Sequence, residues 1–150
     1  MYQRQVSFSE AITSAFSQYC NFSGRASRSE YWWFCLFNFI VMFILGIFEG
    51  LFAAGKGEGS AANIFFYALQ CGWSLAVLLP GLGLAFRRLH DTGRSGWNIL
   101  WGLLPVVGSI ILIVFFCQES QMHDNQYGPV PNLTDYNNNP NQTRYGQGQY

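Results

Sequence analysis

Three long apolar stretches dominate the pattern of hydrophobic and polar positions along the chain. They cover residues 31–52, 61–86 and 97–117, and the second and third contain no charged side chain. Helices of these lengths would reach about 30 Å or more, which is the thickness of the hydrocarbon core of a bilayer. A helical bundle in water would need a polar face on each helix, and open strands cannot satisfy their backbone groups in lipid. The pattern therefore predicts three transmembrane helices.

Proline and glycine interrupt the third stretch. Pro105 and Gly108 lie inside it, and both residue types favour a bend in a helix. The prediction is a bent third span over 97–117.

A shorter amphipathic pattern precedes the first span. Apolar residues recur at helical spacing from Phe8 to Cys20, and polar residues fill the opposite face. Ser7 and Glu10 have the spacing of a capping box, and Gly24 is suited to follow the end of a helix. Residues 1–30 are therefore expected to hold an amphipathic helix, which lies either in the membrane interface or against the protein's own surface.

Composition agrees with a membrane protein. Of the 150 residues 50% are hydrophobic and only 11% are charged, against about 25% charged in soluble domains. The net charge of zero gives no electrostatic support for nucleic-acid binding. Residues 118–150 are rich in Asn, Gln, Gly and Tyr, which predicts a polar, largely disordered tail with local order around 125–131. The expected fold class is an all-α membrane protein with an interfacial N-terminal helix and a three-helix transmembrane domain over 31–117.

The positive charges fall on one side of this arrangement. Basic residues cluster before the first span and after the second, at Arg4, Arg25, Arg28, Arg87, Arg88 and Arg94. Basic loops stay in the cytoplasm. The N-terminus and the loop 87–96 are therefore expected in the cytoplasm, and the C-terminal tail is expected outside.

Three segments carry a resemblance to a known family. They read FSGRASRSEYWW over residues 22–33, FRRLHDTGRSGW over 86–97, and NQYGPVP over 125–131. In this order around apolar runs they resemble the YhaH-like family of small bacterial inner-membrane proteins, the domain of unknown function 805. The resemblance covers roughly residues 8–131 and implies a multi-pass protein of the bacterial cytoplasmic membrane, with no established activity. The polar tail after Pro131 departs from the family pattern.

The segments that flank the spans hold the densest polar chemistry. One interpretation is a positive loop that only fixes topology, with Glu30 capping the first span through Ser27. The other is a site for an anion or a lipid headgroup, because arginine binds phosphate through paired donors. The candidate residues are Arg25, Arg28, Glu30, Arg87, Arg88, His90, Asp91 and Arg94.

Polar residues within the spans are few. Asn38 and Gln70 lie in the first and second spans, and we expect a hydrogen bond between them, with a bond to each residue's own backbone as the alternative. The centres of the spans lack ionisable groups, which argues against proton-coupled transport.

The sequence favours a non-enzymatic protein. His90 and Asp91 are adjacent in sequence, which rarely gives a general base and its orienting carboxylate, and a nucleophile is not identifiable. The four cysteines are scattered, so neither a metal site nor a cofactor is expected. The leading hypothesis is a module that binds lipid headgroups or a membrane-protein partner through a cytoplasmic arginine-rich face. The alternative is one subunit of a homo-oligomeric channel or transport component, because three helices hardly enclose a pore.

Overall fold

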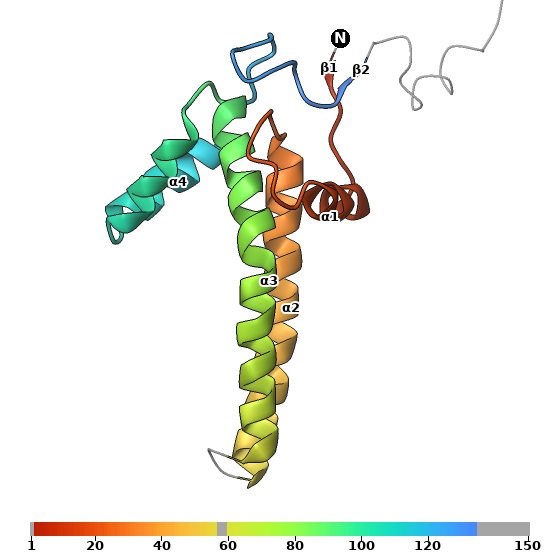
Figure 1. Cartoon of the computed structure of the whole chain (residues 1–150), viewed down its shortest axis with the longest axis vertical. Coiled ribbons are helices and arrows are strands. Elements are labelled where there is room, and N and C mark those ends of the chain that lie inside the picture. Colours follow the sequence, from red (N-terminus) through yellow and green to blue (C-terminus); the bar gives the residue numbers. More distant parts are fainter. Residues whose placement is uncertain (1, 57–59, 135–150) are drawn as a thin grey trace, which may run out of the picture.

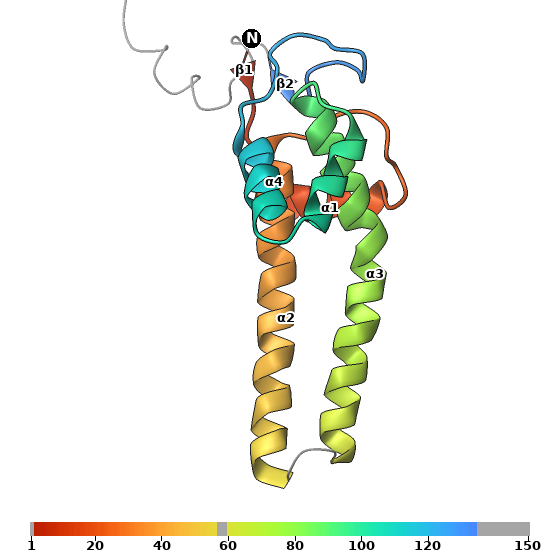
Figure 2. The same cartoon turned by 90° about the vertical axis from the view of Figure 1, so that its left-hand side faces the viewer.

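Two long helices form a stem, and the other elements gather at one end of it (Figure 1, Figure 2). This computed structural model describes residues 2–56 and 60–134. The stem consists of α2 (Arg28–Lys56) and α3 (Ala61–Asp91), which are 29 and 31 residues long. Helices of these lengths extend about 44 to 46 Å, more than the hydrocarbon core requires. Both are long and apolar enough to cross a membrane, as predicted for 31–52 and 61–86.

Local capping fixes where the stem helices begin. The Ser27 hydroxyl accepts a hydrogen bond from the amide of Glu30 at 3.4 Å, and the Glu30 carboxylate accepts from the amide of Ser27 at 2.9 Å. The Ser60 side chain likewise caps α3 through the amide of Asn63. At its other end α3 continues through Arg87 to Asp91, so the arginine-rich segment predicted as the loop 87–96 is helical in its first half.

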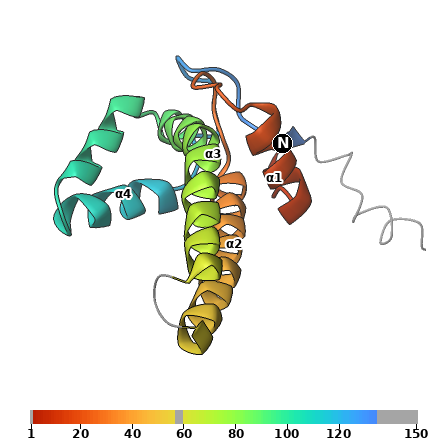
Figure 3. The same cartoon turned by 60° about the horizontal axis from the view of Figure 1, so that its bottom comes forward.

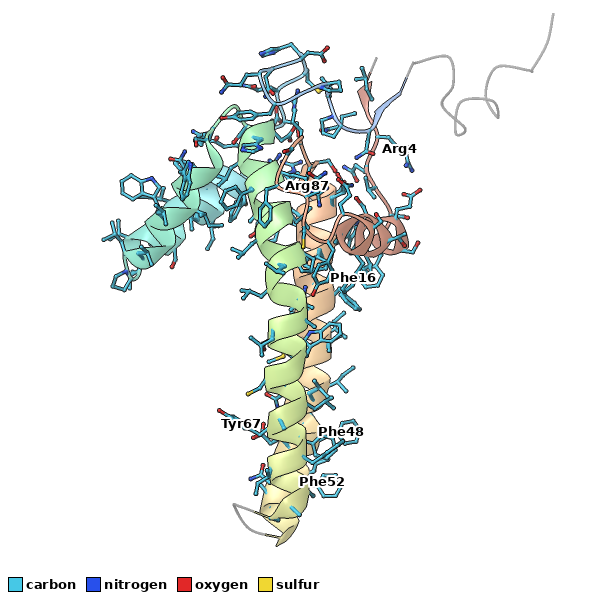
Figure 4. The ribbon with its side chains drawn as sticks, viewed as in Figure 1. Arg4, Phe16, Phe48, Phe52, Tyr67 and Arg87 are labelled. Atoms are coloured by element: carbon cyan, nitrogen blue, oxygen red, sulfur yellow. The ribbon has the colours of Figure 1, made fainter. Side chains whose placement is uncertain are left out.

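The far half of the stem is held by aromatic contacts between the two helices. Phe66 of α3 stacks on Phe48 and Phe52 of α2, with ring centroids 5.7 and 5.2 Å apart. Phe48 and Phe52 lie in the lower part of the stem in Figure 4. Most large apolar side chains there face outward, as lipid-facing positions do.

The N-terminal segment adds α1 (Phe8–Ser17) to the other end of the stem, which we call the head. Ser7 and Glu10 form the predicted capping box, and α1 buries Ala11 and Ala15. Its aromatic side chains pack edge-on against α2, with Phe16 and Phe34 centroids 5.9 Å apart. The buried apolar core lies in the head, in two clusters that include Ala15, Ala26, Phe34 and Leu84, and Ala85, Leu89 and Phe116.

The third apolar stretch folds back on itself instead of forming the bent transmembrane span predicted over 97–117. It forms the 3-10 helix η1 (Gly96–Leu103) and the α-helix α4 (Val107–Cys117). The chain reverses between them at Pro105 and Val106, and Val106 has a φ of 66°. Each limb reaches only about 16 Å, half the hydrocarbon core. Figure 3 shows η1 and α4 as a horseshoe beside the stem.

Because this stretch returns to the head, the segment after it lies beside the N-terminus. The amide of Gln121 donates to the carbonyl of Asp91 at 3.1 Å. The strands β1 (Tyr2–Gln3) and β2 (Leu133–Thr134) pair antiparallel. Residues 118–134 are therefore ordered and share one end of the stem with the N-terminus, which corrects the expectation of a tail on the opposite side. The disorder predicted for 135–150 lies outside the described residues.

Candidate functional site

A buried carboxylate organises the charged residues of the head. Asp91, at the end of α3, is fully buried. Its Oδ1 accepts from Nε of Arg25 at 3.0 Å, and its Oδ2 accepts from Nη1 of Arg88 and from the Ser120 hydroxyl. Two guanidinium groups thus share one carboxylate in a site that excludes water.

The remaining donors of these two arginines hold the returning chain. Arg25 donates through Nη1 to the carbonyl of His123 at 2.8 Å and through Nη2 to the carbonyl of Gln121. Arg88 donates through Nε to the carbonyl of Phe116 at 3.2 Å and through Nη2 to that of Gln118. Burying charge is tolerable only when paired and hydrogen-bonded, and both conditions are met here. Through these hydrogen bonds the Arg25–Asp91–Arg88 cluster holds residues 116–123 against the stem.

Glu30 forms a second polar centre between α1, α2 and the last described segment. Its carboxylate accepts from the hydroxyl of Ser14 at 2.9 Å and from Nδ2 of Asn132 at 3.2 Å, in addition to its capping bonds with Ser27. Through these bonds the Glu30 carboxylate holds α1, the start of α2 and the segment around Asn132 together.

Arg87 is buried in the head without such partners. It is 1% exposed, and its Nε and Nη2 have no hydrogen-bond partner among the described residues. Its carbonyl accepts from the amide of Ala26 at 3.0 Å, so its backbone also joins the segment before α2 to α3. Figure 4 shows Arg87 near the start of α2.

His90 and Asp91 point to different partners and form no acid–base pair. The His90 ring stacks on Tyr127, with centroids 3.8 Å apart and planes 4° apart. Its Nδ1 lies 3.2 Å from the carbonyl oxygen of Gly24. The stacking of His90 on Tyr127 holds the 125–128 turn against the head.

Two of the predicted arginines lie nearer the surface. Arg28 is exposed, with Nη1 3.4 Å from the carbonyl of Cys117. Arg94 is half-buried over the ring of Phe115 and bonds the Gln118 side chain. The structure thus brings most of the eight candidate residues into one head but turns Arg25, Arg87, Arg88 and Asp91 inward. An open face made of all the predicted arginines is not formed.

An open groove lies beside this buried cluster. It has a volume of about 540 Å³ and lies between the start of α2 and the segments 3–5 and 119–122. We call it the interface groove, and its defining residues are Arg4, Arg28, Trp32, Trp33, Leu36 and Glu119. Sequence reasoning missed it because one wall, at 119–122, is more than 80 positions from the other lining residues. The local signals were Arg28, a predicted candidate for a headgroup site, and the adjacent tryptophans at 32 and 33.

The predicted hydrogen bond between Asn38 and Gln70 is wrong. Asn38 donates to the carbonyl of Phe34 in its own helix at 2.9 Å, and Gln70 donates to Oε2 of Glu49 at 2.6 Å. The helices run antiparallel, so Gln70 meets Glu49 near the far end of α2, about three turns beyond Asn38.

Comparison with known proteins identifies the family. The family model described as "Protein of unknown function (DUF805)" matches residues 19–129. The chain is 42% identical to inner membrane protein YhaH of Escherichia coli K12 over 117 residues, which cover 77% of this chain and 90% of that protein. It is 40% identical to inner membrane protein YhaI of the same strain over 119 residues, 79% of this chain and 92% of that protein. No solved structure matches the chain.

These relatives are inner membrane proteins, and the two long apolar helices of the stem agree with a membrane location. The chain is therefore a helical membrane protein that belongs to the DUF805 family.

Proposed function

We propose that the protein is a non-enzymatic membrane module whose interface groove binds the headgroup of a phospholipid. The observation that carries this proposal is the position of Arg28 beside Trp32 and Trp33 in the first turns of a membrane-length helix. Tryptophan is enriched at the headgroup level of membranes, and arginine binds phosphate through paired donors. The groove therefore offers a cation where phosphate groups lie and apolar walls where acyl chains begin.

A comparison of Arg4, Arg25, Arg28 and Arg88 selects Arg28 as the headgroup ligand. Arg25 and Arg88 have their donors occupied by Asp91 and by main-chain carbonyls. Arg4 forms an exposed ion pair with Glu10 at 3.1 Å. Arg28 makes one long bond to the carbonyl of Cys117, is exposed, and lines the groove. Glu119, on the opposite wall, suits an amine in the headgroup.

We also propose that the head faces the cytoplasm. The head holds Arg4, Arg25, Arg28, Arg87, Arg88 and Arg94, whereas the far end of the stem holds Lys56. The positive-inside rule places the arginine-rich end in the cytoplasm. Both the N-terminus and residues 118–134 then lie on the cytoplasmic side, and the membrane domain has two spans and one folded-back segment.

Native mass spectrometry of protein extracted from membranes tests the headgroup site. Arg28→Gln should lose most of the co-purifying phospholipid, and Arg28→Lys should retain part of it because the positive charge remains. Lys56→Gln, which removes one positive charge at the far end of the stem, should retain lipid at the unsubstituted level. Equal lipid retention in Arg28→Gln and Lys56→Gln would overturn the proposal.

The same spectra test the oligomeric alternative. A subunit of a channel should appear as a ring of defined copy number, with or without lipid. A monomer that carries phospholipid supports the headgroup-binding module.

A further inference from the structure

We propose that residues 96–117, here called the folded-back hairpin, insert into only the head-side leaflet of the membrane. The protein then acts as a wedge in that leaflet. It accumulates where the head-side surface of the membrane is convex. This inference goes beyond headgroup binding, because it concerns the acyl chains around the hairpin and the shape of the membrane. Its ligand is the acyl-chain layer of one leaflet.

The lengths of the two limbs limit how deeply the hairpin reaches. η1 has 8 residues and α4 has 11. Each corresponds to about 16 Å, which matches one leaflet of a hydrocarbon core about 30 Å thick. A segment of this size can reach no farther than the middle of the bilayer before it returns.

Contacts at both ends of the hairpin hold it to the head. The amide of Gln121 bonds the carbonyl of Asp91 at 3.1 Å, and Nε of Arg88 bonds the carbonyl of Phe116 at 3.2 Å. Leu89 and Phe116 are buried in one apolar cluster. Since the segments before η1 and after α4 are tied to the same helix end, the hairpin cannot deliver the chain to the opposite side.

The surface of the hairpin is suited to hydrocarbon. Residues 97–117 contain no charged side chain. At the reversal Leu103, Val106 and Val107 are 78%, 71% and 60% exposed. An apolar surface of this extent is a liability in water, whereas acyl chains cover it without cost. The backbone groups of both limbs are largely bonded within their helices, which lipid requires.

The arrangement of the elements makes the two leaflets unequal. The folded-back hairpin and α1 project sideways from the head half of the stem, on different sides of it (Figure 1, Figure 3). The far half consists of α2 and α3 alone in the described residues. The head-side leaflet therefore gives up more area to the protein than the opposite leaflet does. Convex curvature on the head side expands the head-side leaflet, so it accommodates the larger area that the protein takes up there.

The depth of the hairpin can be measured directly. In a variant whose native cysteines are replaced by serine or alanine, Val106→Cys is labelled with a nitroxide in phospholipid vesicles. Collisions with oxygen should exceed those with a water-soluble relaxation agent, as for a site in the hydrocarbon of the head-side leaflet. A Val106 label in contact with water on either side would overturn the proposal.

Protein density in membrane tethers pulled from giant vesicles tests the wedge. Protein oriented with its head on the outer surface of the tether should be enriched severalfold over the flat vesicle membrane, and protein with the opposite orientation should be depleted. The triple variant Leu103→Ser, Val106→Ser and Val107→Ser should lose this enrichment. These positions are exposed, so the substitutions leave the core intact, and an unchanged melting temperature checks this. The matched control carries Leu69→Ser, Leu75→Ser and Leu78→Ser on exposed positions of α3 and should retain the enrichment.

Enrichment that is independent of orientation, or that survives the triple substitution in the hairpin, would overturn the wedge. Arg28→Gln should sort into tethers like the unsubstituted protein, so a failure of headgroup binding is distinguishable from a failure of the wedge.

Discussion

Gly108, in the first turn of α4, lies directly against the main-chain carbonyl of Trp101 in η1. A Cβ at position 108 would overlap that carbonyl and would lie 3.1 Å from Cβ of Leu104. The two limbs of the folded-back hairpin can approach this closely only because position 108 has no side chain. The shape of the third apolar stretch thus depends on one glycine.

Gly108→Ala should therefore destabilise the protein, by about 1–3 kcal/mol as for overpacked cores. Thermal unfolding in detergent measures the effect. Gly46→Ala is the matched control, because a Cβ at position 46 of α2 meets no atom within 4 Å. Equal melting temperatures for the two variants would show that the limbs do not pack as described.

Asp91→Asn should be among the most destabilising single substitutions in the head. It removes the carboxylate that compensates two buried guanidinium groups, and loss of one partner from a buried ion pair costs about 3–5 kcal/mol. Urea or thermal unfolding in detergent measures the free energy of unfolding of each variant. Arg4→Gln breaks the solvent-exposed Arg4–Glu10 pair and should change the free energy of unfolding far less than Asp91→Asn does. A small effect of Asp91→Asn would mean that water reaches this cluster.

Glu49 and Gln70 should be energetically coupled across the stem. Their side chains form a hydrogen bond of 2.6 Å between α2 and α3, and such bonds in membranes contribute about 0.5–2 kcal/mol. A double-mutant cycle with Glu49→Ala and Gln70→Ala measures the coupling. The cycle with Asn38→Ala and Gln70→Ala should give none, and coupling there instead would contradict the observed register of the two helices.

The capping carboxylate of α1 should titrate well below the usual range for glutamate. The amide of Ser7 and the guanidinium of Arg4 lower the pKa of Glu10 from 4.5 to about 2. Because the pKa is lowered in the folded state, its contribution to stability is complete above pH 4.5 and is lost as the pH falls toward about 2. Carbon-13 NMR of the side-chain carboxyl follows the titration.

Ser7→Ala should move this pKa back toward 4.5, because it removes the hydroxyl that holds the capping box together. Ser17→Ala, the same change at the other end of α1, should leave the titration of Glu10 unchanged. A normal titration of Glu10 in the unsubstituted protein would contradict the capping geometry.

Local signals were enough to predict the stem and α1. Uncharged runs of membrane length gave the two long helices, and the pairs Ser7–Glu10 and Ser27–Glu30 marked where two helices begin. Pro105 and Gly108 indicated a bend in the third stretch. The full reversal could not be predicted, because the bonds that fix its ends join Asp91 and Arg88 to residues about 28 to 30 positions further on.

The candidate site shows the same limit. The sequence correctly grouped Arg25, Arg88 and Asp91 at one end of the spans. It did not predict their burial, because the carbonyl oxygens that satisfy the two arginines come from residues 116–123, which the three-span prediction assigned largely to the other side of the membrane. The interface groove was missed for a related reason, since one of its walls comes from the same segment.

The pairing of Tyr2 with Thr134 sets an order of assembly during synthesis. Once Asp91 has left the ribosome, α2 and α3 are complete and can enter the bilayer as a helical pair. At that stage Arg25 and Arg88 still lack the main-chain acceptors that only a later part of the nascent chain supplies. Strand β1 gains its partner β2 last, so the head is complete only after translation has passed residue 134.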